Sequence, residues 1–148
     1  MRRWGVILIK IKKMSKYFTL EELARSAVAK RCGIDNTPPA DIAEKLAALI
    51  GKVLDPVRHK WGSPITVNSG YRCPALNSHP EVGGAKNSQH TKGEAADITA
   101  GSRELNQRLF RLIMSGGFEF DQLIDEKDFL WIHISYAEGR NRKQVLHL

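Results

Sequence analysis

The hydrophobic pattern of this chain of 148 residues changes its period once, near the turn sequence at 61–64. Before it, Thr19 and Glu22 form a capping box that predicts a helix over about 20–30. Apolar residues from Ile42 to Leu54 then repeat with the period of a long amphipathic helix. After the turn come short strand-like runs at 65–67, 95–98, 122–126, 131–135 and 144–147, and one helix over about 102–114. This order predicts an α+β fold in which N-terminal helices pack on a small antiparallel sheet.

Two details refine this prediction. We expect Gly33 to end the first helix and Pro56 to kink or break the second near Leu54. Residues 69–94 are rich in Gly, Asn and Ser and predict a long, mostly irregular segment. Irregular segments of this length inside a domain are often functional, so the site is expected here.

The apolar content sets the class of protein. A hydrophobic fraction of 42% is enough to bury a core, and the length fits one domain. The longest apolar run, Val6-Ile7-Leu8-Ile9, is far shorter than the roughly 20 residues of a transmembrane helix. Lys10 follows it at once, which is unlike a secretory signal. We therefore expect no transmembrane segment, no signal peptide and synthesis in the cytoplasm.

The net charge of +7 comes from 23 basic and 16 acidic residues. Residues 1–13 carry five basic residues and no acidic one, so the rest of the chain holds only +2. We predict a basic N-terminal extension at 1–16, one domain at 17–148, and no specific nucleic-acid partner. Cys32 and Cys73 are too few for a disulfide scaffold, so free thiols are expected. We also expect a monomer.

Three residues stand out as metal ligands: His90, Asp97 and His133. Catalytic zinc sites use three His or carboxylate ligands and leave a fourth position open. Gly93 would let the backbone turn between the first two ligands. Spacing alone also allows a structural interpretation, in which His90 is a loop residue, Asp97 a turn cap and His133 a hydrogen-bonded core residue.

The wider pattern favours the metal site. Residues 88–97 read Ser-x-His-x-x-Gly-x-Ala-x-Asp, residues 131–133 read Trp-x-His, and residues 69–72 read Ser-Gly-Tyr-Arg. Together they resemble the zinc D-alanyl-D-alanine carboxypeptidase and dipeptidase superfamily, which includes phage L-alanyl-D-glutamate endopeptidases and the hedgehog signalling domain. The resemblance covers about residues 17–145. It implies His90, Asp97 and His133 as zinc ligands, Arg72 as the partner of a substrate carboxylate or scissile carbonyl, and Ser88 as a substrate contact.

The general base is where the sequence departs from the commonest pattern of that superfamily, which has an acid three residues before the last histidine. Leu130 stands there. If 122–126 pairs with 131–135 as a hairpin, Ile124 lies opposite His133 and Glu126 lies diagonally on the same face. Glu126 is therefore the predicted base, and Asp128 in the loop is second. Asp125 should face the other way because strand side chains alternate. Glu126 as an exposed strand-end acid remains the alternative.

These residues and the resemblance predict a zinc peptidase with one zinc ion per chain. Its expected reaction is hydrolysis of a bond involving a D-amino acid in peptidoglycan stem peptides, either carboxypeptidase-like or endopeptidase-like. Phage-type lysis or cell-wall remodelling are the expected settings, with action on the wall after release. The alternatives are a non-catalytic zinc-containing module that binds the cell wall or a protein, and a basic nucleic-acid binder.

Overall fold

The computed structural model describes residues 16–148. The predicted basic extension at 1–16 therefore lies outside the described residues except for Lys16. The backbone amides of Lys16 and Tyr17 donate hydrogen bonds of 2.8 and 3.2 Å to the buried carboxylate of Asp55. These two bonds fix the start of the described chain to a helix well downstream in the sequence.

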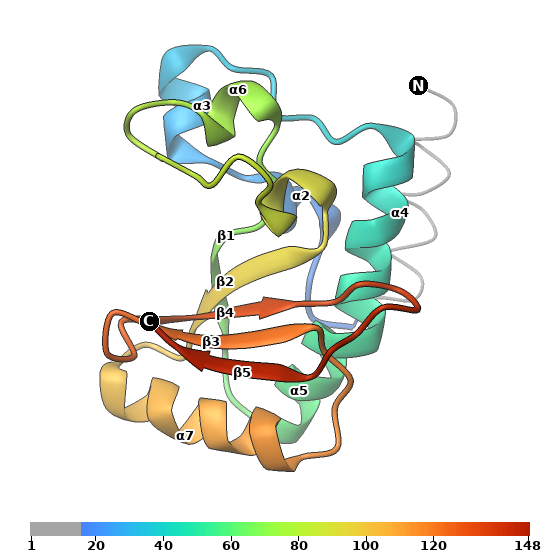
Figure 1. The fold of residues 1–148 in the computed structure, drawn as a ribbon, viewed down its shortest axis with the longest axis vertical. Helices are drawn as coiled ribbons and strands as arrows, with labels where there is room; N and C mark the ends of the chain where they lie inside the picture. Colours follow the sequence, from blue (N-terminus) through green and yellow to red (C-terminus); the bar gives the residue numbers. More distant parts are fainter. Residues whose placement is uncertain (1–15) are drawn as a thin grey trace.

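A five-stranded sheet runs through the molecule in the order β1-β2-β4-β3-β5 (Figure 1). Its strands are β1 (Thr66–Ser69), β2 (Ala95–Thr99), β3 (Gln122–Glu126), β4 (Trp131–Ser135) and β5 (Gln144–His147). The pairs β1–β2, β2–β4 and β3–β4 are antiparallel. The edge strand β5 pairs with β3 in parallel, which the sequence did not predict. The fold is α+β, as predicted.

The single helix predicted over 20–30 is wrong. The structure has two short helices, α2 (Leu20–Ala24) and α3 (Ala27–Cys32), with Arg25 in an extended conformation between them. Thr19 caps the first helix through the amide of Glu22, as predicted. Ser26 caps the second by accepting a hydrogen bond of 3.2 Å from the amide of Ala29. A Ser side chain that caps a new helix competes with continuation of the previous one, which explains the break.

The long helix behaves differently at its proline. Helix α4 (Ala40–Leu49) continues through a π-helical segment, η1 (Ile50–Leu54), into α5 (Asp55–Trp61). The backbone amide of Asp55 bonds to the carbonyl of Ile50, five residues earlier. Pro56 therefore does not break the helix near Leu54, because a widened turn absorbs the disturbance that its ring and missing N–H create.

The remaining helices are α6 (Pro74–Asn77), the 3₁₀ helix η2 (Gln89–Lys92) and α7 (Arg103–Ser115). The first two lie in the segment 69–94, which is otherwise irregular, as predicted. Helix α7 contacts β3 and β4, and α5 contacts α7. No helix of the described part, residues 16–148, is long and apolar enough to span a membrane.

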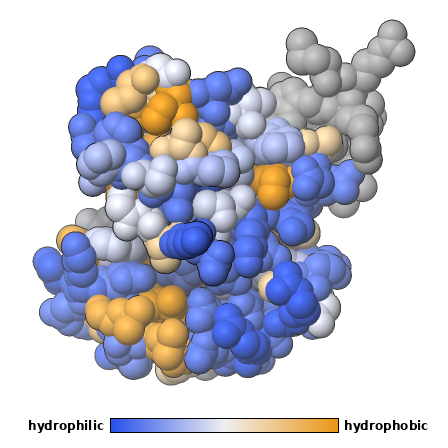
Figure 2. Space-filling view, turned by 45° about the horizontal axis from the view of Figure 1, so that its top comes forward, coloured by the Kyte–Doolittle hydropathy of each residue, from blue (hydrophilic) through white to orange (hydrophobic). Residues whose placement is uncertain are grey.

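The core lies on one face of the central strands. Ile132 and Ile134 of β4 are fully buried in it, together with Ile98 of β2. Because side chains alternate along a strand, His133 and Asp97 point to the opposite face. On the face shown in Figure 2, hydrophilic side chains predominate and apolar ones gather in separate patches. The sheet thus presents one apolar face to the helices and leaves the other for polar groups.

Candidate metal centre

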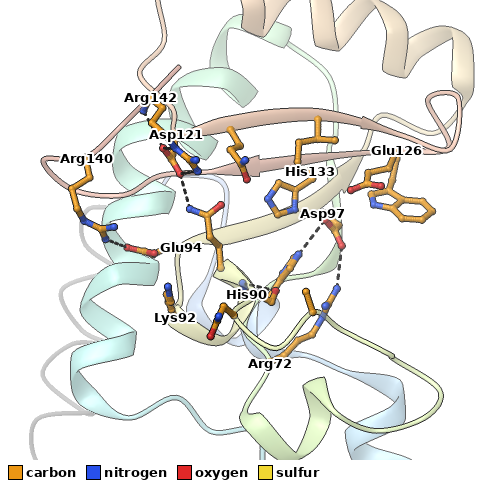
Figure 3. Close-up of a pocket in the computed structure, with 17 residues that line it drawn as sticks. Arg72, His90, Lys92, Glu94, Asp97, Asp121, Glu126, His133, Arg140 and Arg142 are labelled. Atoms are coloured by element: carbon orange, nitrogen blue, oxygen red, sulfur yellow. Dashed lines mark hydrogen bonds and ion pairs between the residues drawn. The ribbon is translucent and has the colours of Figure 1, made fainter. Parts of the chain in front are cut away.

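Two neighbouring strands and one 3₁₀ helix bring the three predicted ligands together. Asp97 of β2 pairs directly with His133 of β4. Oδ1 of Asp97 lies 3.2 Å from Nδ1 of His133 and 3.3 Å from Nε2 of His90, which η2 supplies. The three side chains are buried, and one ligand atom from each lies within 4.8 Å of the others. Figure 3 shows them converging in the middle of the cleft.

This arrangement fits a tetrahedral metal ion. Ligand bonds of about 2.0–2.2 Å place two corners of a tetrahedron about 3.3–3.6 Å apart, close to the two separations observed here. Nδ1 of His90 is 2.7 Å from the carbonyl oxygen of Gly70, which directs Nε2 toward Asp97. Nδ1 of His133 faces Asp97, and the other ring nitrogen, Nε2, is buried without a hydrogen-bond partner among residues 16–148.

The carboxylate of Asp97 is held in its charged form. Burial by itself would raise the pKa of Asp97, but hydrogen bonds from His133 and His90 outweigh it and bring that pKa well below its usual range. Oδ2 accepts a further bond of 3.3 Å from the guanidinium of Arg72. One oxygen therefore faces the two imidazoles and the other faces the arginine.

The Ser-Gly-Tyr-Arg segment supports His90 through its backbone. A Cβ atom on Gly70 would lie 2.2 Å from the carbonyl oxygen of Leu23, so this position requires glycine. The close approach allows the amide of Tyr71 to donate a bond of 2.6 Å to that oxygen. The amide of Arg72 donates to the carbonyl of His90 at 3.1 Å. The segment is thus clamped between α2 and the 3₁₀ helix that carries the ligand.

Three hydrogen bonds fix the guanidinium of Arg72. It donates to Ser69 at 3.0 Å, to Asn77 at 3.4 Å and to Asp97. Its side chain is 16% exposed and lines the cleft. Two of its five N–H groups remain available beside the candidate metal centre. Asn77 was not predicted as a site residue, and its only sequence signal is its place in the irregular segment.

Ser88 and Gly93 bound the helix that carries His90. The hydroxyl of Ser88 accepts a bond of 3.2 Å from the amide of His90 and caps η2. Gly93 ends this helix with a φ of 72°, and a Cβ there would lie 2.8 Å from atoms of Ile42. Ser88 also lines the cleft, whereas its contact with substrate stays a prediction.

The predicted hairpin register is confirmed. Ile124 pairs with His133 and Glu126 pairs with Trp131. Glu126 lines the cleft, which has a volume of about 630 Å³. Asp125 faces away: its carboxylate accepts a bond of 2.6 Å from the amide of Phe129 and lies 3.1 Å from Nδ1 of His147.

The second candidate base, Asp128, is exposed in the loop and does not line the cleft. Its backbone carbonyl accepts a hydrogen bond of 3.0 Å from Arg103. Of these three neighbouring carboxylates, only Glu126 therefore lines the cleft.

Two ion pairs that the sequence did not predict lie at the far side of the cleft, across the three candidate ligands from Glu126 (Figure 3). Arg142 forms two bonds of 2.9 Å with buried Asp121, one to each carboxylate oxygen, and Gln89 donates to the same group at 2.8 Å. The hydrogen bond from Arg142 lowers the pKa of Asp121 to about 2. Arg140 binds buried Glu94 at 2.8 Å. These pairs join residues far apart in the sequence, so spacing gave no sign of them.

Comparison with known proteins agrees with this geometry. The family model described as Peptidase M15 matches residues 16–135. The chain belongs to this family. The M15 chain is also 53% identical over 51 residues to the zinc D-Ala-D-Ala carboxypeptidase of Streptomyces albus G, a match that covers 34% of the chain. It spans only 19% of the length of that relative. The resemblance seen in the sequence motifs is confirmed.

Proposed function

We propose that this M15 chain is a zinc-dependent peptidase that hydrolyses peptide bonds in peptidoglycan stem peptides. The observation that carries the proposal is the convergence of His90, Asp97 and His133 in a cleft lined by Arg72 and Glu126. The name of the Streptomyces relative supports both the metal and the D-amino-acid substrate.

His90, Asp97 and His133 would hold one zinc ion. When bound, zinc polarises a scissile carbonyl and acidifies water. Glu126 accepts the proton that the attacking water loses and returns it to the leaving amine, as a general base and then a general acid. Arg72 uses its remaining N–H groups to hold the scissile carbonyl oxygen and to stabilise the negative charge that develops on it. Ser88 contributes a substrate contact at the cleft wall.

The finer assignment is part of the same proposal. The reaction is either the removal of a terminal D-Ala or cleavage between L-Ala and D-Glu. The protein acts as a monomer on the cell wall after release, in phage-type lysis or in wall remodelling. A non-catalytic zinc-containing module is the second candidate, because Leu130 occupies the position three residues before the last ligand, where the superfamily commonly has an acid.

Defined murein peptides provide the test. Purified protein with measured zinc content is incubated with these peptides, and mass spectrometry identifies the fragments. We expect one cleavage product, its loss after chelation, and recovery when zinc is returned. Asp97→Ala is the matched control and should contain little zinc. Full zinc content without cleavage of any peptide would contradict the peptidase and favour the binding module.

A further inference from the structure

The far side of the cleft is lined by three cations, Lys92, Arg140 and Arg142. The two acids nearby, Glu94 and Asp121, have side chains only 4% exposed, and each already pairs with an arginine. The arginine side chains are 66% and 57% exposed, so part of each guanidinium faces outward. A bound anion would therefore meet the cations before the acids.

Lys92 is the cation without a counter-charge. It is exposed, and its side chain forms no hydrogen bond or ion pair with residues 16–148. In Figure 3, Glu126 lies on one side of the three candidate ligands, and Lys92 lies with Arg140 and Arg142 on the other. The charge within the cleft is thus asymmetric, with an acid at one side and an excess of one positive charge at the other.

The position of Lys92 relative to the metal centre is fixed by its helix. Lys92 follows His90 by two residues in η2, and Gly93 packs directly against Ile42 of α4. Because Ser88 caps one end of this short helix and Gly93 is packed at the other, the backbone of Lys92 stays close to that of His90. The ammonium group itself stays adjustable, because it sits at the end of a flexible four-carbon chain.

Arg72 is the other cation that lines the cleft, but three of its five N–H groups already bond to Ser69, Asn77 and Asp97. The proposed mechanism uses the remaining two for the scissile carbonyl. A substrate carboxylate next to the scissile bond requires another cation. Both candidate bonds present such a group: the leaving residue is D-Ala with its terminal carboxylate, or γ-linked D-Glu with its free α-carboxylate.

We propose that Lys92 binds the α-carboxylate of the residue on the leaving side of the scissile bond, with Arg140 as a second cation at the same subsite. This inference rests on the proposed peptidase function and deepens it, because it assigns a substrate feature to a particular side chain. The cleft then selects peptides in which this carboxylate is free and disfavours those in which it is amidated.

Two peptide pairs test the subsite: one ends in D-Ala-D-Ala or its amide, and the other carries γ-linked D-Glu or its α-amide. The kcat/KM of the carboxylate form should exceed that of the amide by about tenfold in the wild type, from one charge-assisted hydrogen bond. Lys92→Met should bring this ratio close to one, mainly through KM, and Lys92→Arg should retain most of it. Lys45→Met, which removes an exposed lysine of α4 outside the cleft, should leave it unchanged. The pair that responds identifies which carboxylate is bound.

Equal ratios in the wild type and Lys92→Met, or no preference in the wild type, would overturn the subsite. A second measurement separates this failure from failure of the peptidase. Calorimetric binding to zinc-loaded Glu126→Gln protein, with and without Lys92→Met, gives the same carboxylate-to-amide ratio without turnover. If the wild type cleaves nothing while this binding ratio depends on Lys92, the peptidase fails and the subsite stands. Absence of binding to both carboxylate peptides overturns the subsite as well.

Discussion

Asp125 and Glu126 are neighbouring carboxylates on β3 that face opposite sides of the sheet. Glu126 lines the cleft, whereas Asp125 is 7% exposed and bonds to the amide of Phe129 and to His147. Replacing each by its amide should therefore separate catalysis from stability. Glu126→Gln is expected to change turnover, and Asp125→Asn is expected to change the free energy of unfolding.

The size of each effect follows from the contacts. Glu126→Gln removes a proton acceptor, so kcat/KM should fall by about 10²–10⁴. Within residues 16–148 the side chain of Glu126 forms no hydrogen bond, so the melting temperature should move by less than about 2 °C. Asp125→Asn keeps one acceptor oxygen and loses the charged interaction with His147. This loss should cost about 1–2 kcal/mol, or about 2–8 °C, with kcat/KM within about twofold of wild type.

The assay compares the two variants and Asp128→Asn at equal zinc occupancy. Metal analysis gives the occupancy, differential scanning calorimetry gives the melting temperature, and mass spectrometry of peptide fragments gives the rate. Asp128→Asn should match the wild type in all three. If Glu126→Gln keeps full turnover while Asp125→Asn or Asp128→Asn abolishes it, the assignment of the base from the sheet register is refuted.

Three further predictions concern the support of the site. Asp97→Ala should lose zinc, and chelation should lower the melting temperature of the wild type but not of this variant, as measured by calorimetry. Gly70→Ala should destabilise the fold by about 2 kcal/mol or more in urea unfolding, because its Cβ would meet the carbonyl of Leu23 at 2.2 Å. Asp121, with its pKa lowered by Arg142 to about 2, stabilises the fold above its ordinary pKa of 3.8 and loses this contribution as the pH falls toward 2. The stability difference of about 1–2 kcal/mol between wild type and Asp121→Asn should therefore shrink between about pH 5 and pH 2.

The sequence predicted the hairpin best. Residues 122–126 and 131–135 became β3 and β4 with the expected register, because alternation along a half-buried strand and a short loop leave few other pairings. This register placed Glu126 in the cleft and Asp125 outside it. The three ligands were recognised from motif spacing and resemblance. Their convergence depends on the pairing of Asp97 with His133 across β2 and β4, which spacing alone does not determine.

The sequence predictions failed where a local capping or helical-turn alternative won, and they missed ion pairs between residues far apart in the sequence. Ser26 is a moderate helix former inside the predicted helix, yet its hydroxyl caps a new helix and ends the first one early. Pro56 normally breaks a helix, but the π-helical turn before it removes the conflict. The Arg142–Asp121 and Arg140–Glu94 pairs form only once the C-terminal segment folds back over the cleft, so no local pattern indicates them.

The close contact of Gly70 and Tyr71 with the carbonyl of Leu23 limits how far the chain can be shortened at its N-terminal side without disturbing the candidate metal centre. The carbonyl of Leu23 receives the amide of Tyr71, and the carbonyl of Gly70 receives the imidazole of His90. The orientation of a ligand ring thus depends on a short helix that contributes no side chain to the cleft. A chain shortened past α2 would keep every ligand and every motif, but the imidazole of His90 would lose the support that aims it. The smallest fragment able to hold the ion must therefore begin ahead of Leu20, far upstream of its first ligand.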